Sequence, residues 1–476
     1  MNTPIQRLYA LVLLLFALLV YFTSRNAVFD ATALRDNALN RRTLLEEQQI
    51  HRGTIRAADG TVLARSVKQR GGVYSRRYPT GGLFGHAIGY SFTTLGRAGL
   101  ERSRNDDLTG KRNVLTSVLD QLRGKQQVGD DVKTTLDPAA QRVAYSALAG
   151  RHGAVVALDP RTGAVRVMAS LPQYDPNALR GPGTYSRLAN DNTNKPLVNR
   201  ATQFGYAPGS TFKVVTATAA IDSGRFTPQS TVDGKNDVKI SGVPLQNDFN
   251  QSFGPIDLST ALAKSVNTVY AQVAEKLGKA TMKRYMQRFG FDQKPQLDYP
   301  ADQMSSSGEY RNGKLLPPTS RFVDVGRMGI GQDKLAVTPL QMAEVAAAVA
   351  NGGKLMKPHM TDRVVDPDGR TVQRVGAQVQ STVMKPSTAA AVTSMMEGVV
   401  NNGTGTQAQI PGVRVAGKTG TAETQIGTKI NNVWFIAFAP ADNPRVAIAV
   451  TMQGQSGFGG DVAAPVAKAV MESLLH

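Results

Sequence analysis

The pattern of hydrophobic and polar positions divides the chain into three parts, and the first is an apolar run near the N-terminus. Residues 8–22 contain no charged side chain, and Arg7 and Arg25 stand on either side of them. A helix between the two arginines would rise roughly 27 Å, which nearly spans a bilayer if both side chains reach toward the headgroups. A cleaved signal peptide is the alternative, but the residues after the run do not supply the small-residue cleavage pattern. The pattern predicts a membrane helix over residues 8–24 and a cytoplasmic tail over residues 1–7.

The second part, residues 25–137, is polar and has only short regular patterns. Residues 26–51 favour a helix-prone stalk, and apolar residues on both sides of Asp59-Gly60 indicate a β-hairpin. Short strand-like pieces follow, and residues 113–122 could form a helix. Because no group of side chains here suggests catalysis, we expect an elongated α+β pedestal domain that spaces or docks the protein.

The third part, residues 138–476, has strand patterns at both ends and helical patterns between them. Asp137 is a predicted N-cap, and Pro138 stands at the first position of a helix that runs to Leu148. Strands are predicted at residues 154–158, 164–170, 414–421, 433–439 and 446–452, and helices at residues 258–264, 268–277, 339–350, 387–400 and 462–475. One antiparallel sheet built from both ends, flanked by helices and interrupted by an all-helical insert, accounts for this order. The predicted fold class is α+β.

The candidate chemistry begins at the turn signal Pro208-Gly209. A helical pattern that is apolar on nearly every side follows it and continues to Gly224, which is typical of a helix inside a domain. Its first turn places Ser210 and Lys213 on one face, at i and i+3. Burial favours an uncharged amine, and a neutral lysine can take the proton of a serine hydroxyl. Ser210 is therefore a candidate nucleophile; a capping serine beside a solvent-facing lysine is the alternative for this motif taken alone.

Composition and charge exclude several classes of function. The absence of cysteine rules out thiol catalysis, thiolate metal sites and disulfides, and the five histidines are scattered without ligand spacing. We therefore predict no metal site and no cofactor. The net charge of +19 fits an anionic membrane or cell-wall polymer better than nucleic acid, because Lys and Arg form no run with interleaved aromatic residues.

Two further motifs complete a candidate site. Ser265-Val266-Asn267 forms a polar corner between two helical patterns, and Lys418-Thr419-Gly420-Thr421 ends a predicted strand, where the glycine would let another backbone approach. The Ser-x-x-Lys that starts at Ser210 and the Lys-Thr-Gly that starts at Lys418 each occur once in the chain. The order Ser-x-x-Lys, Ser-x-Asn, Lys-Thr-Gly is the combination found in serine β-lactamases and penicillin-binding proteins.

With these motifs the chain resembles the class B penicillin-binding proteins, which are monofunctional D,D-transpeptidases, and among them the PbpA type. Two departures lie outside the catalytic motifs: Arg56-Ala57-Ala58 replaces a usual acidic-arginine pair, and Asp333 stands where a glycine is common. The resemblance covers nearly the whole chain and extends to Arg52-Gly53-Thr54-Ile55, Gly99-Leu100-Glu101, Leu108-Thr109-Gly110, residues 171–177, Gly331-Gln332, residues 338–341 and residues 416–423.

The resemblance implies an enzyme that cross-links peptidoglycan. Ser210 would attack a D-alanyl-D-alanine stem peptide and form an acyl-enzyme after Lys213 takes its proton. Ser265 would then pass a proton to the leaving amine. Asn267 would fix Lys213 and a substrate amide, and Lys418 would hold Lys213 neutral.

The remaining implied roles concern substrate binding. Thr419, Gly420 and Thr421 would belong to the strand against which the donor peptide lies, with the two threonines on its terminal carboxylate. The backbone N–H groups of Ser210 and Thr421 would form the oxyanion hole.

The same resemblance implies partners and a location. β-Lactams would be covalent inhibitors, and residues 25–137 would dock on a SEDS glycosyltransferase of the RodA/FtsW type and other cell-wall machinery. The large domain is expected outside the cell, because long domains translocate regardless of charge and the short N-terminus could not function.

Several alternatives remain open. A membrane-anchored serine β-lactamase shares the three motifs, although the chain has no Glu-x-x-x-Asn after Asn267 to activate a deacylating water. A D,D-carboxypeptidase would differ only in the acceptor. A bifunctional enzyme would need a larger N-terminal domain. Finally, the chain could be a non-catalytic docking partner and regulator of a SEDS glycosyltransferase.

Overall fold

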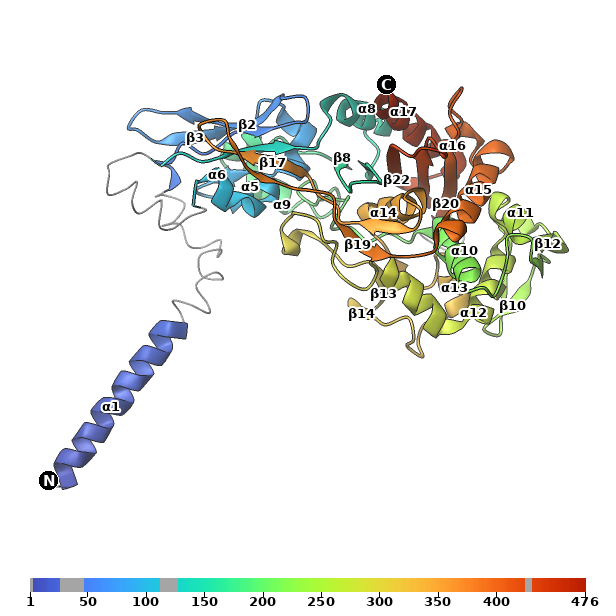
Figure 1. Ribbon diagram of the computed structural model, residues 1–476, viewed down its shortest axis with the longest axis horizontal. Coiled ribbons are helices and arrows are strands. Elements are labelled where there is room, and N and C mark those ends of the chain that lie inside the picture. The colour runs from blue at the N-terminus through green and yellow to red at the C-terminus, as the bar shows by residue number, and fades with distance from the viewer. Residues whose placement is uncertain (1–2, 26–46, 112–126, 424–429) are drawn as a thin grey trace.

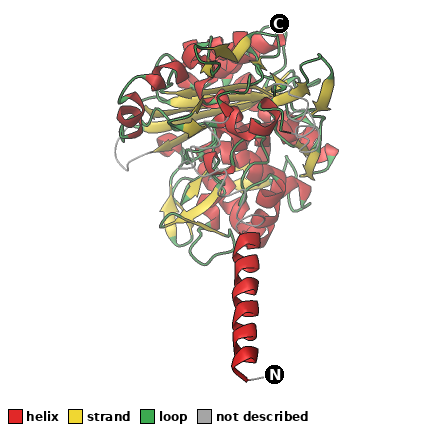
Figure 2. Cartoon of the chain, turned by 90° about the vertical axis from the view of Figure 1, so that its left-hand side faces the viewer, coloured by secondary structure: helices red, strands yellow, loops and turns green. Residues whose placement is uncertain are grey.

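The N-terminal segment forms a single apolar helix. The structure is a computed structural model that describes residues 3–25, 47–111, 127–423 and 430–476. In it α1 (Thr3–Ser24) has no buried residue (Figures 1 and 2). Of the helices in the described ranges, it alone is long and apolar enough to cross a membrane, so it fits a single-pass anchor. The predicted helix is confirmed, but it begins at Thr3 and so includes most of the predicted tail.

A six-stranded sheet organises the N-terminal part of the body. Its strand order is β18-β17-β6-β1-β2-β3, with β1 and β6 parallel and the other pairs antiparallel. β1 and β2 are the hairpin predicted around Asp59-Gly60. The strands are β1 (Ile55–Arg56), β2 (Val62–Lys68), β3 (Tyr74–Arg77), β6 (Asp131–Thr134), β17 (Thr361–Val365) and β18 (Thr371–Arg374).

The sheet draws two of its strands from far along the chain. β17 and β18 belong to the part of the sequence that the prediction assigned to the C-terminal domain, yet they complete the edge of this sheet beside β6 (Figure 1). Pairing with β17 satisfies backbone groups that β6 would otherwise leave unpaired. A single boundary at residue 137 therefore does not separate the two parts of the body. The predicted stalk over residues 26–51 lies mostly outside the described residues, as does the predicted helix over residues 113–122.

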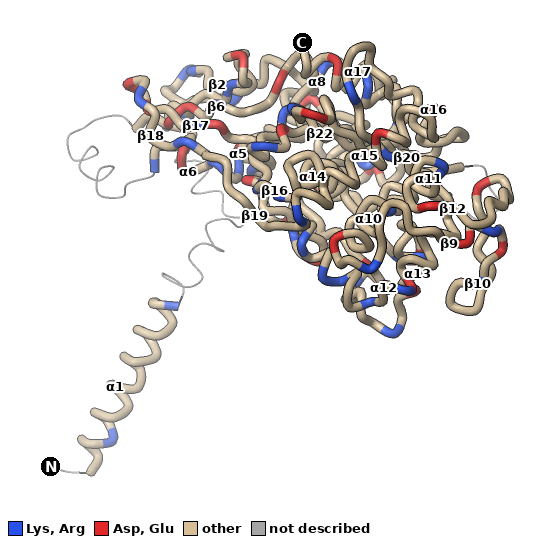
Figure 3. The backbone as a smooth tube through the Cα atoms, turned by 45° about the vertical axis from the view of Figure 1, so that its right-hand side comes forward, with Lys and Arg blue, Asp and Glu red and all other residues tan. Residues whose placement is uncertain are grey.

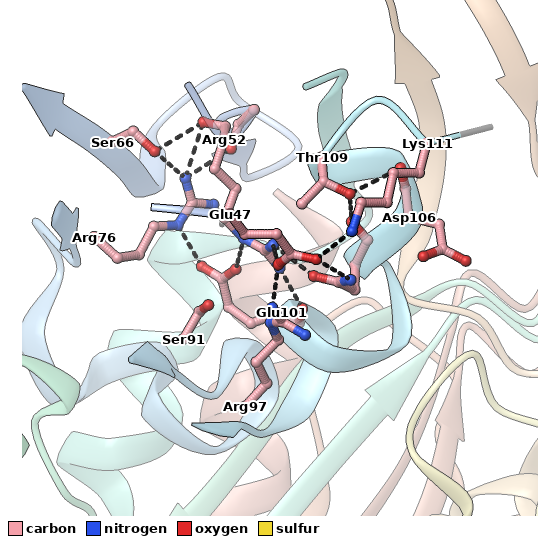
Figure 4. Close-up of polar contacts among 12 residues, drawn as sticks. Glu47, Arg52, Ser66, Arg76, Ser91, Arg97, Glu101, Asp106, Thr109 and Lys111 are labelled. Carbon is pink, nitrogen blue, oxygen red and sulfur yellow. Dashed lines mark hydrogen bonds and ion pairs between the residues drawn. The ribbon is translucent and has the colours of Figure 1, made fainter. Parts of the chain in front are cut away.

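A buried ion-pair network holds the small elements of the N-terminal part together (Figure 4). Glu101 is fully buried, and its carboxylate accepts hydrogen bonds from Arg52 Nε at 2.8 Å and Arg76 Nε at 2.5 Å. Burial alone would raise the pKa of Glu101, but the two guanidinium groups outweigh it and hold the pKa below its usual value. The short elements around this network are η2 (Gly81–Phe84), α4 (Gly85–Ile88), β4 (Ser91–Phe92), β5 (Gly96–Arg97), α5 (Gly99–Ser103) and α6 (Asn105–Leu108).

The C-terminal part is built on a five-stranded antiparallel sheet with the order β20-β21-β22-β7-β8. Alternate residues of each central strand enter two different cores: Ile448 and Val450 of β22 pack with α8 and α17, whereas Ala447 and Ala449 join the larger core. The bounds are β7 (Gly153–Leu158), β8 (Val165–Leu171), β20 (Ala416–Glu423), β21 (Asn431–Ala439), β22 (Val446–Gln455), α8 (Pro138–Leu148), α16 (Gly459–Val462) and α17 (Ala464–Leu475).

Helices between the two halves of this sheet form the insert that the sequence predicted. The main ones are α10 (Lys213–Asp222), α11 (Leu258–Ala263), α12 (Asn267–Arg288), α13 (Val325–Met328), α14 (Pro339–Ala350) and α15 (Pro386–Asn402). The remaining elements are short: η3 (Pro176–Arg180), α9 (Thr184–Ala189), η4 (Gly209–Phe212), β9 (Thr231–Asp233), β10 (Val238–Ile240), β11 (Val243–Leu245), η5 (Asp248–Asn250), β12 (Pro255–Asp257), η6 (Ala301–Gln303), β13 (Gly308–Arg311), β14 (Lys314–Leu316), β15 (Leu335–Ala336), β16 (Lys354–Met356), β19 (Val379–Thr382) and η7 (Thr406–Ala408). The predicted α+β class is confirmed, and so is the antiparallel sheet built from strands at both ends of the C-terminal part.

Candidate active site

The Ser-x-x-Lys segment lies at the start of the central helix. After Pro208 the turn η4 leads directly into α10, whose residues from Lys213 to Ala220 are all buried, as the apolar pattern predicted. Gly209 has a φ of 52°, and a Cβ atom there would lie 2.5 Å from the carbonyl oxygen of Thr421. Only glycine fits this turn, which carries the half-buried Ser210. Lys213, in contrast, is fully buried.

The Ser-x-Asn corner receives the Lys213 amine. Ser265 joins α11 to α12 with a φ of 61°, and Asn267 is the first residue of α12. Lys213 Nζ donates to the carbonyl oxygen of Ser265 at 2.6 Å and to Asn267 Oδ1 at 2.6 Å, and Ser265 Oγ lies 3.3 Å away. A neutral amine has two hydrogens, so these two strong bonds leave its lone pair free to accept a proton from a hydroxyl.

The orientation of the Asn267 amide is fixed from its other end. Asn267 Nδ2 donates to the carbonyl oxygen of Gln246 and to Asp248 Oδ1, both at 3.2 Å. Because the nitrogen is engaged there, the oxygen is the atom that faces Lys213. No motif in the sequence singles out Asp248.

The Lys-Thr-Gly strand places a second buried amine on the same hydroxyl. Lys418 on β20 is fully buried, and its Nζ donates to Ser265 Oγ at 2.9 Å and to the carbonyl oxygen of Thr419 at 3.1 Å. A Cβ atom at Gly420 would lie 2.7 Å from the carbonyl oxygen of Pro208, so glycine lets β20 pack against the turn that carries Ser210. Residues more than 200 positions apart in the sequence therefore form one polar cluster.

Burial makes both amines easier to deprotonate. It lowers the pKa of Lys213 to about 7, with the carboxylate of Asp248 acting in the opposite direction. Burial and the neighbouring Lys213 lower the pKa of Lys418 well below its usual value. Two amines that share the Ser265 hydroxyl repel each other when both are charged. This repulsion favours the state in which at least one of the two lysines is neutral.

The strand also presents hydroxyl groups beyond Lys418. Thr419 Oγ1 lies 2.6 Å from Thr404 Oγ1, and Thr404 N donates to the carbonyl oxygen of Ala263 at 3.1 Å. Thr404 thus links β20 to the end of α11, just before the Ser265 corner. Thr421 Oγ1 accepts a hydrogen bond from Gly459 N at 3.2 Å. Only the turn residues around Thr404 mark it in the sequence, so pattern reasoning missed it.

The eight residues selected from the sequence lie in three segments that meet in space, namely η4 with the start of α10, the corner between α11 and α12, and β20, but one expected contact is missing. In the described part of the chain, the hydroxyl of Ser210 makes no hydrogen bond, because the Lys213 amine is engaged by Ser265 and Asn267 instead. Of the eight residues, Ser210 and Thr421 are half-buried and the others are buried. No group of three or more His, Asp or Glu side chains among the described residues could hold a metal ion.

A serine hydroxyl on a tight turn, two buried lysines and a Lys-Thr-Gly strand define a serine acyl-transfer site of the penicillin-binding class. The family model described as "Penicillin binding protein transpeptidase domain" matches residues 153–472, and that of the "Penicillin binding protein A dimerisation domain" matches residues 52–132. The chain belongs to the penicillin-binding protein transpeptidase family.

Within this family the chain is similar to the peptidoglycan D,D-transpeptidases named PbpA. It is 34% identical to PbpA of Mycolicibacterium smegmatis, over 100% of this chain and 99% of the relative. It is 33% identical to PbpA of Mycobacterium tuberculosis strain H37Rv, with the same coverage. Among solved structures, the ceftriaxone acyl-enzyme complex of penicillin-binding protein A from M. tuberculosis aligns with a TM-score of 0.81 and 32% identity, over 91% of this chain and 100% of that one.

Proposed function

We propose that this protein cross-links peptidoglycan stem peptides by a D,D-transpeptidase reaction through an acyl-enzyme on Ser210. The observation that carries the proposal is the shared hydroxyl of Ser265, which lies 3.3 Å from Lys213 Nζ and 2.9 Å from Lys418 Nζ. This arrangement gives a neutral amine next to the helix turn of the serine, and a proton path that leads away from it.

The acylation step follows from these positions. As Ser210 Oγ attacks the carbonyl carbon of the penultimate D-alanine, its proton passes to the lone pair of Lys213. The tetrahedral oxyanion is stabilised by the backbone N–H groups of Ser210 and Thr421. When the C–N bond breaks, Ser265 donates its proton to the departing D-alanine amine and is reprotonated from the lysine pair, which restores the proton count.

The second half of the reaction needs an acceptor amine. A stem-peptide amine attacks the Ser210 ester and loses its proton to the lysine pair. The ester C–O bond then breaks, the lysine pair passes a proton to Ser210 Oγ, and the cross-linked amide is released. Before acylation, Thr419 and Thr421 bind the terminal carboxylate of the donor, and the donor peptide lies along β20 as an added strand. The relatives named D,D-transpeptidase favour this reaction over a carboxypeptidase or a β-lactamase.

Covalent trapping with a β-lactam tests the proposal. The full chain is incubated with benzylpenicillin, and intact-mass measurement with peptide mapping locates the adduct. We expect one equivalent on Ser210, no adduct with Ser210→Ala, and unchanged labelling with Ser186→Ala, a serine exposed on α9. A stable adduct on Ser210→Ala would overturn the assignment. Rapid hydrolysis of the adduct would point to a β-lactamase, and transfer only to water in a stem-peptide assay would point to a carboxypeptidase.

The location and docking partner are part of the same proposal. We infer a cytoplasmic N-terminus, α1 as the single membrane span and the catalytic domain outside the cell. The N-terminal pedestal, formed by residues 25–137 together with β17 and β18, docks on a SEDS glycosyltransferase of the RodA/FtsW type, and the rest of residues 138–476 form the transpeptidase domain. Protease protection in spheroplasts tests the orientation. If the Ser210→Ala variant restored cell shape as well as the wild type, a scaffold role without catalysis would replace the proposed function.

A further inference from the structure

One face of the six-stranded sheet carries an unusual number of basic side chains. Strand residues alternate between the two faces. Ile55, Val132 and Val364 are fully buried on the inner face, so their neighbours in sequence point outward. The basic residues of the outward face, called here the basic face, are Arg56, Arg65, Arg77, Lys133, Arg363 and Arg374.

The strand register sets these residues directly opposite one another. Arg374 of β18 pairs with Arg363 of β17, which pairs with Lys133 of β6, which pairs with Arg56 of β1. At the other end of the sheet, Arg65 of β2 pairs with Arg77 of β3. Like charges directly opposite across strands destabilise a sheet. The row of four basic residues across β18, β17, β6 and β1 therefore lowers the stability of the sheet. Its presence is not explained by a role in folding.

Few acidic groups neutralise this face. The carboxylate of Asp131 lies 3.7 Å from Arg56, and that of Asp362 lies 3.8 Å from Arg363. The acidic residues of the β17–β18 turn lie beyond the strand ends, where Asp368 is 3.7 Å from Arg370. The other four basic side chains of the face have no ion pair recorded with a described residue: Arg65, Arg77, Lys133 and Arg374.

The basic face is also open to solvent. Arg65, Arg77 and Arg374 are exposed, and Arg56 keeps 43% of its side-chain area exposed even though it contacts Asp131. Figure 3 shows basic positions, with some acidic ones among them, near β2, β6, β17 and β18, away from the five-stranded sheet that carries Lys418. An exposed face with more basic than acidic side chains attracts an anionic surface.

We propose that the basic face binds the anionic phospholipid headgroups of the membrane that holds α1. The choice of a bilayer follows from the connection: α1 ends at Ser24, and the body resumes at Glu47, so the sheet lies within about 80 Å of the end of the span even with the link fully extended. Gln48, the next residue, already accepts a hydrogen bond from Tyr74 N of β3, so the chain enters the body at the edge of this sheet. The lipid headgroup layer therefore stays within reach of the basic face.

This binding would set how the catalytic part is oriented above the membrane. With the sheet held against the headgroups, the body can no longer rotate freely on its link, and the active site would be presented at a fixed height and direction. The inference concerns the six-stranded sheet only and does not depend on the proposed transpeptidase reaction.

The expected strength is that of several independent charge contacts. Each Lys or Arg near an anionic surface strengthens binding about fivefold, and the attraction falls off within a Debye length of about 8 Å at physiological salt. Removing three charges should therefore weaken the bound orientation about 100-fold. Raising the salt concentration should have a similar effect.

Energy transfer from the sheet to the bilayer tests the proposal on the full chain. Because the chain has no cysteine, Thr371→Cys on exposed β18 can be labelled at a single site with a fluorescent donor. The protein is reconstituted through α1 into vesicles with a headgroup-labelled acceptor lipid. The vesicles contain either phosphatidylcholine alone or phosphatidylcholine with phosphatidylglycerol. Thr231→Cys on β9, in the helical insert, serves as the comparison label.

Two variants that each lose three positive charges distinguish attraction at the basic face from an effect of the net charge of the protein. The test variant Lys133→Gln/Arg363→Gln/Arg374→Gln removes three charges of the basic face. The control variant Lys239→Gln/Lys314→Gln/Lys354→Gln removes three exposed charges elsewhere. Labelling of Ser210 by fluorescent penicillin checks that both variants are folded.

We expect higher transfer from the Thr371 site in phosphatidylglycerol vesicles, loss of this increase in the test variant or at high salt, and no loss in the control variant. Equal transfer in both lipid mixtures would overturn the proposal, and so would an increase that survives in the test variant. Transfer that rises only when soluble poly(glycerol phosphate) is added to phosphatidylcholine vesicles would also overturn it, in favour of a cell-wall polymer.

Discussion

The rate of Ser210 acylation should fall steeply below neutral pH, because Lys213 must be neutral to take a proton. Burial lowers the pKa of Lys213 to about 7. If the amine titrates at that value, its neutral fraction is about one half at pH 7, about one tenth at pH 6 and about one hundredth at pH 5. The second-order rate constant for acylation should follow this fraction. An exposed lysine, with a pKa of about 10.4, would give almost no neutral amine anywhere in this range.

The assay measures acylation by a fluorescent penicillin from pH 5 to pH 9. The rate constant is taken from quenched time points, and circular dichroism at each pH confirms that the protein stays folded. The acidic limb is the part of the pH profile where the rate constant falls with falling pH. Because Lys213 and Lys418 interact through Ser265, the midpoint of this limb reflects the titration of the two lysines together. A rate constant that is flat between pH 5 and pH 8 would refute the assignment of a neutral lysine as the base.

A substitution at Asp248 tests independently in which direction the acidic limb moves when the pKa of Lys213 changes. The Asp248 carboxylate raises the pKa of Lys213, and Asp248→Asn removes its charge while keeping an oxygen acceptor for the Asn267 amide. The pKa of the lysine should fall, the acidic limb should move to lower pH, and the variant should be faster than wild type at pH 6. Asp233→Asn, an exposed acidic residue on β9, is the control that should leave the limb in place. A limb that moves to higher pH in Asp248→Asn would contradict the reasoning.

Three further changes test other features of the site. Lys418→Met should lower the acylation rate about 10²–10⁴-fold, as expected for loss of a proton-transfer group, without lowering the thermal unfolding midpoint; a midpoint well below wild type would indicate a mainly structural role. Gly420→Ala brings a Cβ atom within 2.7 Å of the Pro208 carbonyl oxygen, so it should cost about 1–3 kcal/mol in thermal melting and also slow acylation. The rings of Phe249 and Phe458 lie 5.3 Å apart, between the loops that carry Asp248 and Gly459. Because such a ring pair contributes about 0.5–1.5 kcal/mol, Phe249→Ala should speed acylation by bulky cephalosporins about 2–10-fold; unchanged rates would mean that the pair does not restrict entry.

The sequence predicted best those elements whose ends carry local chemical signals. α14 runs from Pro339 to Ala350 as expected, because Thr338 Oγ1 accepts a hydrogen bond from Gln341 N and fixes its start. α8 likewise begins after Asp137, whose carboxylate accepts bonds from two backbone N–H groups. Capping is local, so the pattern of a few residues is enough to place the boundary.

Elements whose limits depend on distant contacts could not be placed in this way. The sequence predicts a helix over residues 268–277. Gly278, the next residue, does leave helical geometry with a φ of 75°, but α12 continues to Arg288. Burial of Met282 and Tyr285 in the large core stabilises this extension. The pairing of β17 with β6 has the same origin, since no turn signal links residues so far apart.

The site shows the same division between local and distant information. Motif order identified the eight candidate residues, because spacing within each motif is a local property. The sharing of Ser265 Oγ by two amines, and the roles of Asp248 and Thr404 as supports, arise only when three elements meet in space.

The buried lysines of this site lower the free energy of unfolding, and this cost explains why the site lies in the largest core. A lysine whose pKa is lowered on folding binds its proton more strongly in the unfolded chain, so unfolding takes up protons and stability rises with pH between the folded and unfolded values. For Lys213, with values of about 7 and about 10.4, the cost at pH 7 is about 4 kcal/mol, close to the lower end of the net stability of a typical domain. Such a cost can be borne only where the surrounding core is large, which is the position of α10. It also follows that a partly folded chain has no activated serine. Lys418 is carried by β20, which is paired with β21, so its contact with Ser265 depends on the formed sheet.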